Sequence, residues 1–221
     1  IMEAFNPRAA MAKHDGKHVE LLLKINERII SLTIFPFMIL GITGEILFKL
    51  FFGENWLEAG IIVQILVVRI FFEIIFSPTL SLINIIEKQE INLYRRVANI
   101  IVVTLSLVIG GIYNNFYLAI LMMSLLEGLV IGFSGLYIMR IIKFPIIYLF
   151  KKVFVYFMIC ILLGITILIF KNWFILSVPM ILFLIMLSTL IYYTLIFYKD
   201  RELRAIGLNF IMQFSSFKRD S

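Results

Sequence analysis

A charged pair inside a long apolar stretch most constrains what this chain can fold into. Residues Ile61–Ile86 would rise about 39 Å as an α-helix, enough to cross a bilayer core of about 30 Å with some tilt. Arg69 and Glu73 lie near the middle, spaced so that they share one helix face. An isolated charge at that depth costs at least ~2.5 kcal/mol, so both side chains should face protein or water. Such a helix requires other helices around it.

The rest of the chain can supply those helices. Hydrophobic residues make up 62% of the sequence and the mean hydropathy is +1.04, whereas soluble domains are about 45–50% apolar. The pattern predicts an all-α integral membrane protein. Its six transmembrane helices form a lobe over residues 29–198, at 29–52, 61–86, 97–113, 116–139, 153–170 and 174–198. Pro36 and Pro78 predict kinks in the first two, and Gly41 and Gly44 weaken the first further.

The segments outside the spans are polar or amphipathic. Residues 1–28 and 199–221 are predicted to form cytoplasmic amphipathic helices at the membrane surface, a lead-in and a tail. Gly53 is expected to end the first helix and Asn114-Asn115 to form a tight turn. The remaining connections are predicted as a polar turn, a basic connector and a short turn, at 87–96, 140–152 and 171–173.

The basic residues are distributed unevenly between the two sides. Of the 20 lysines and arginines, 17 fall in the two ends and in the second and fourth connections. This bias predicts that both termini are cytoplasmic. It also argues against a nucleic-acid surface, because the charge is divided among four membrane-edge segments. The single cysteine, Cys160, excludes an intrachain disulfide.

The polar residues inside the spans allow more than one interpretation. Arg69 and Glu73 either line a cavity for a charged substrate, with Gln64 and Asn84 adding hydrogen-bonding groups on the same helix, or form a structural ion pair. Glu127 is either a protonation site for ion coupling or a partner for Arg69 across a helix interface.

A stripe of small residues lies beside Glu127 on the fourth span. Ser124, Gly128, Gly132 and Gly135 recur at helical spacing and predict close approach of another helix.

Charges near the ends of the spans have simpler interpretations. Glu45 and Lys49 are predicted to be a solvated pair. Arg95 and Arg96 are either topology charges or contacts for lipid phosphate. No cofactor or metal site is expected, because the histidines of the amino-terminal segment lack a third ligand. No catalytic motif is found, and the outer loops are short, so an enzyme is not expected.

Several of these residues together resemble a known family. Pro7-Arg8 and Glu27-Arg28 flank a basic amphipathic segment, and a span with Pro36 follows. Leu50–Gly60 reads LFFGENWLEAG, an LFG-x-x-W-x-x-A pattern, and precedes a span with Pro78. This arrangement resembles the carboxy-terminal half of Wzx-type polysaccharide and O-antigen flippases, in the polysaccharide transporter family of the MOP exporter superfamily.

The resemblance implies a function and a set of partners. A family member would have two lobes around a central cavity and would move a polyprenyl-pyrophosphate-linked oligosaccharide across a bacterial inner membrane. The six helices would form one lobe, Arg69 would be the best cavity cation, and the partners would be membrane lipids and an amino-terminal lobe. Because the chain begins with Ile1, we expect a fragment. The alternatives are a non-transporting interaction subunit, and a lipid II flippase or multidrug exporter of the same superfamily.

Overall fold

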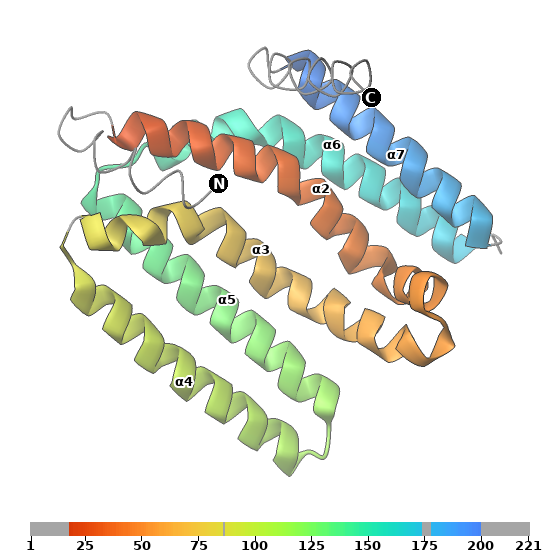
Figure 1. Ribbon diagram of the computed structural model, residues 1–221, viewed down its shortest axis with the longest axis horizontal. Helices are drawn as coiled ribbons and strands as arrows, with labels where there is room; N and C mark the ends of the chain where they lie inside the picture. The colour runs from red at the N-terminus through yellow and green to blue at the C-terminus, as the bar shows by residue number, and fades with distance from the viewer. Residues whose placement is uncertain (1–17, 86, 174–177, 200–221) are drawn as a thin grey trace, which may run out of the picture. The chain divides into compact units, whose positions relative to one another are not determined.

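The computed structural model describes residues 18–85, 87–173 and 178–199, and these residues are mostly helical (Figure 1). Within those ranges, six helices are long and apolar enough to cross a membrane. The described residues therefore confirm the predicted all-α structure with six helices of transmembrane length. The helices are α2 (His18–Phe52), α3 (Leu57–Ile85), α4 (Gln89–Ile112), α5 (Phe116–Ile141), α6 (Ile146–Trp173) and α7 (Val178–Lys199), with a short 3-10 helix, η1 (Glu54–Trp56), between α2 and α3.

Two compact units divide the chain. The first, Ile1–Met158, contains α2 to α5 and the first part of α6. The second, Ile159–Ser221, contains the rest of α6 and α7. All of the interhelical contacts described below lie within the first unit.

The amino-terminal lead-in and the first predicted span share one helix. α2 begins at His18 and continues without a break past Arg28. Two residues of the lead-in, Leu22 and Asn26, are fully buried. At least one face of this part of α2 therefore packs against protein rather than against a membrane surface. Residues 1–17 of the lead-in and residues 200–221 of the predicted tail lie outside the described residues.

Gly53 ends α2, as predicted from the sequence. Its φ of 98° lies in a region that side chains disfavour, and its amide donates to the carbonyl of Lys49 at 2.9 Å. The chain then turns through η1, where the ring of Trp56 lies 5.6 Å from that of Phe52. This turn reverses the chain, so that α3 packs along α2.

The predicted tight turn at Asn114-Asn115 is also confirmed. Asn114 has a positive φ of 47°, which asparagine tolerates better than most residues. The Asn115 side chain caps α5 by accepting a hydrogen bond from the backbone N–H of Leu118 at 3.0 Å.

Three predicted connections are wrong in their extent. The polar turn at 87–96 gives way to helix from Gln89, so Arg95 and Arg96 lie within α4. The basic connector at 140–152 is only the short segment between Ile141 and Ile146, and the turn predicted at 171–173 is the end of α6. Backbone hydrogen bonding extends a helix beyond its apolar part, and hydropathy therefore marks the part that suits the bilayer core rather than the helix ends.

Close backbone approach joins α2 to α3. A Cβ added at Gly60 would lie 2.6 Å from the carbonyl oxygen of Gly44 and 2.6 Å from Cα of Glu45. A Cβ at Gly44 would lie 2.9 Å from the carbonyl oxygen of Gly60. Gly44 therefore has a packing role that the sequence did not indicate, because its lack of a side chain permits this contact.

Pro78 is accommodated inside α3. Proline lacks the N–H that would bond the carbonyl of Ile74, and the Ser77 hydroxyl donates to that carbonyl at 3.1 Å instead. The proline ring itself is buried. The helix therefore continues through Pro78 without leaving the freed carbonyl unpaired.

Two adjacent glycines near the end of α4 differ in their surroundings, and this gives a first prediction. A Cβ at Gly110 would overlap Ala119 on α5, whereas one at Gly111 meets nothing within 4 Å. Gly110→Ala should lower the free energy of unfolding by about 1–3 kcal/mol through overpacking. Gly111→Ala, the matched control, should leave it unchanged or raise it by about 0.5–1 kcal/mol. Denaturant unfolding of the purified protein in micelles measures both, and equal effects would contradict the close α4–α5 contact.

Candidate functional site

The small-residue stripe on α5 faces α3, which confirms the predicted close approach of another helix. A Cβ added at Gly128 would lie 3.7 Å from Cα of Arg69 and 3.2 Å from the ring of Phe72. One added at Gly135 would overlap the ring of Phe76. Residues further along α5 contact residues further along α3, so the two helices run parallel.

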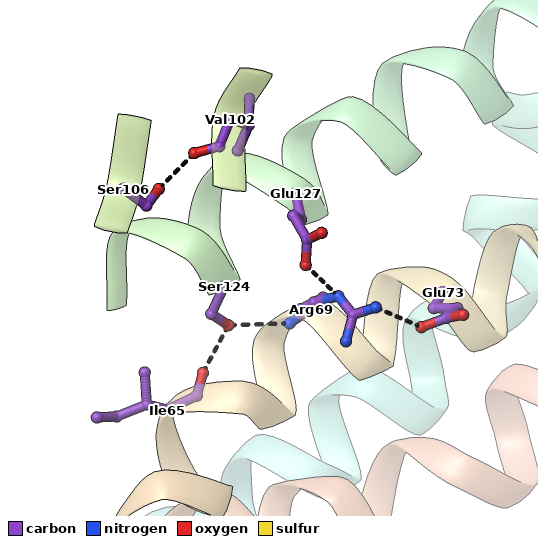
Figure 2. Close-up of polar contacts among 7 residues, drawn as sticks. All are labelled: Ile65, Arg69, Glu73, Val102, Ser106, Ser124 and Glu127. Atoms are coloured by element: carbon purple, nitrogen blue, oxygen red, sulfur yellow. Dashed lines mark hydrogen bonds and ion pairs between the residues drawn. The ribbon is translucent and has the colours of Figure 1, made fainter. Parts of the chain in front are cut away.

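A hydroxyl group fixes the two helices at the level of Arg69. The Ser124 Oγ donates to the carbonyl of Ile65 at 2.7 Å and lies 3.4 Å from the backbone N of Arg69 (Figure 2). These two backbone groups are also partners within the α3 helix, because they are one helical turn apart. The buried Ser124 on α5 therefore bonds to the backbone of α3. This contact places Arg69 beside the following turn of α5, which carries Glu127.

Arg69 lies between two carboxylates in Figure 2. Its Nε is 2.5 Å from Oε2 of Glu127 on α5, and its Nη2 is 3.6 Å from Oε2 of Glu73 on its own helix. The Nε–H is not aimed at the Glu127 oxygen, so the shorter contact is an ion pair without a directed hydrogen bond. The structure thus brings together three of the predicted site residues.

The three charged groups differ in exposure. The side chain of Glu127 is 9% exposed, that of Arg69 is 30% exposed and that of Glu73 is 53% exposed. A buried carboxylate is costly to leave unpaired, so the Arg69–Glu127 contact has a structural role. It supports the interpretation of Glu127 as an interhelical partner for Arg69. With both carboxylates ionised, the cluster carries one net negative charge.

The other predicted cavity residues lie apart from this cluster. Gln64 packs against α2, since a Cβ added at Gly44 would lie 2.9 Å from its Cγ. Asn84 lies near the end of α3, and its side chain is outside the described part of the structure. The structure therefore places Arg69 against α5 and Gln64 against α2.

The charged residues predicted near the helix ends lie in different surroundings. Lys49 Nζ lies 2.7 Å from Oε1 of Glu54 in the turn after α2, a contact that the sequence did not predict, and both side chains are exposed. Arg95 lines a pocket between α4 and α5, and the neighbouring Arg96 is exposed and does not line it. No group of three histidine, cysteine, aspartate or glutamate residues suited to a metal occurs among the described residues.

Sequence reasoning did not assign roles to several buried polar groups. Both side-chain polar atoms of Asn26 on α2 and the hydroxyl of Thr79 on α3 are buried without a hydrogen-bond partner in the described residues. The signal for Ser124 was its place in the small-residue stripe, but the sequence did not show that its hydroxyl would bond the backbone of α3.

Comparison with protein-family models, with curated proteins and with solved structures gave no match. The resemblance to polysaccharide transporters therefore rests on the sequence pattern alone, and the site has to be interpreted from its own chemistry.

Proposed function

We propose that this chain is one lobe of a MOP-type flippase that exports a polyprenyl-pyrophosphate-linked oligosaccharide, such as an O-antigen repeat unit, across a bacterial cytoplasmic membrane. The other lobe would be supplied by an amino-terminal half. In this proposal both termini face the cytoplasm, where the basic residues gather. The observation that carries the proposal is a partly exposed guanidinium midway along a helix apolar enough to span the membrane.

The unequal partners of Arg69 suggest how it would act. The buried carboxylate of Glu127 is 2.5 Å from Arg69, whereas the half-exposed carboxylate of Glu73 is 3.6 Å away. An arriving phosphate would displace the carboxylate of Glu73 more easily than that of Glu127, because less desolvated contact is lost. The substrate phosphate would thus exchange with Glu73, and the departure of the substrate would restore the original pair.

A transport assay in cells tests this proposal, and it gives a second prediction. Deleting the gene should make lipid-linked oligosaccharide accumulate and surface glycan fall. The complete protein with Arg69→Gln and Glu127→Gln together should fail to restore export, because the cavity cation is gone. The second substitution ensures that no unpaired carboxylate is left in the interior. Glu54→Gln, which removes an exposed carboxylate in the turn after α2, should restore export.

Two outcomes would overturn the proposal. Normal surface glycan after gene deletion would remove glycan export as the function. Full export by the double variant at normal protein level would remove Arg69 from the mechanism.

A multidrug exporter of the same superfamily is the second candidate, and one observation favours it. The cluster has two carboxylates for one guanidinium, and a net negative site suits a cationic substrate better than an anionic one. This candidate predicts that gene deletion increases sensitivity to lipophilic cations and leaves surface glycan unchanged. The stripe from Ser124 to Gly135 gives no support for an interaction subunit, because α3 already occupies it.

A further inference from the structure

A pocket of about 550 Å³ lies between α4 and α5, apart from the Arg69 cluster. It is at the end of these helices where α4 begins and α5 finishes. Its lining combines two cations with a wall of aromatic and aliphatic side chains, among them Lys88, Arg95, Tyr94, Val130, Phe133 and Tyr137. An amphipathic molecule with an anionic end would match both parts of this lining.

Arg95 has unused hydrogen-bonding capacity in this pocket. Its Nε is buried and has no hydrogen-bond partner among the described residues, and its Nη2 makes a long contact of 3.5 Å with Oδ1 of Asn92. A buried guanidinium N–H without an acceptor is unfavourable, so an oxygen-rich ligand would stabilise it. A phosphate presents several acceptor oxygens to arginine in a geometry that the guanidinium matches.

The charged side chains that line the pocket sum to one net positive charge, which one anion would neutralise. Lys88 Nζ lies 3.7 Å from Oε1 of Glu90, and both of these side chains line the pocket and are half exposed. From neighbouring positions Glu73 attracts and Arg96 repels the Arg95 charge. Within the described residues, the lining of the pocket therefore has two cations and one carboxylate.

We propose that this pocket binds an anionic phospholipid, whose phosphodiester is held by Arg95 and Lys88 and whose acyl chain lies along Val130, Phe133 and Tyr137. The apolar wall favours a lipid over a free anion, because only a lipid has an acyl chain that can pack against it. The lining of the pocket shares no residue with the Arg69 cluster, although Glu73 of that cluster is near enough to attract the Arg95 charge.

Native mass spectrometry of the complete protein in micelles tests the proposal with phosphatidylglycerol and phosphatidylcholine as probes. The wild type should retain phosphatidylglycerol in preference to phosphatidylcholine. Arg95→Gln should weaken phosphatidylglycerol binding by about tenfold or more, through the loss of a charge-assisted contact. Arg96→Gln removes the adjacent cation outside the pocket and should bind as the wild type does.

A second cation variant and a competition experiment distinguish a lipid site from a free-anion site and from diffuse surface charge. Lys88→Gln changes a half-exposed connector residue that should not affect folding, and it should also weaken binding. Competition by millimolar inorganic phosphate would reveal a free-anion site and overturn the proposal. Equal losses for Arg95→Gln and Arg96→Gln would show diffuse surface charge and would likewise overturn it, as would unchanged binding by both pocket variants.

Discussion

Replacing Arg69 with glutamine is expected to lower the free energy of unfolding by about 3–5 kcal/mol, because Glu127 would keep its buried charge without a partner. The third member of the cluster should behave differently. Glu73→Gln is expected to cost less than about 1 kcal/mol, since the Glu73 side chain is 53% exposed and water can replace the lost contact. Denaturant unfolding of the purified complete protein in micelles, followed by circular dichroism, measures both.

The double variant distinguishes the cost of losing the ion pair from the cost of leaving the Glu127 charge unpaired. Adding Glu127→Gln to Arg69→Gln removes the buried carboxylate and leaves two neutral amides in place of the ion pair. We expect it to recover at least half of the stability lost by Arg69→Gln, as a favourable coupling in a double-mutant cycle. If the double variant is as unstable as the sum of the two single variants, the Arg69–Glu127 contact does not contribute as described.

Replacing Gly60 with alanine is expected to lower the free energy of unfolding by about 1–3 kcal/mol, and replacement with leucine by more. The added Cβ would lie 2.6 Å from backbone atoms of Gly44 and Glu45, and backbone cannot move aside as a flexible side chain can. The helices α2 and α3 would have to move apart, and the close packing between Gly44 and Gly60 would be lost.

Gly41 provides the matched control for Gly60. It lies on the same α2–α3 interface, and a Cβ added there would meet Cγ1 of Val67 at 3.6 Å, an ordinary contact distance. Gly41→Ala should therefore leave the unfolding midpoint unchanged or raise it. Equal destabilisation by the two alanine substitutions would contradict the close approach at Gly60.

Among the described residues, hydropathy predicted the six long helices and their order, because apolar length is a local property. The central charges of α3 and the glycine at the end of α2 were recognised in the same way. The helix ends were predicted less well, since Gln89 and Lys171 are polar residues that helices include once they leave the apolar core. The contact of Gly44 with Gly60 depends on the register of two helices, which no single stretch of sequence specifies.

The candidate site was predictable only in part, for a related reason. The spacing of Arg69 and Glu73 gives their contact directly. The pairing of Arg69 with Glu127 was one of two interpretations, and choosing between them required the parallel packing of α3 and α5. Gln64 was grouped with Arg69 because both lie on one helix, but their separation along the chain turns them toward different neighbours.

The order of the charges along the chain has a consequence for biosynthesis. Arg69 is synthesised before Glu127, with all of α4 in between. When α3 first reaches the bilayer, Glu73 is already present beside Arg69, whereas the buried Glu127 has not yet been synthesised. The nascent α3 should therefore stay at the insertion machinery until the α4–α5 hairpin emerges, and truncation after α4 should leave Arg69 without its buried partner and delay the release of α3 into the bilayer.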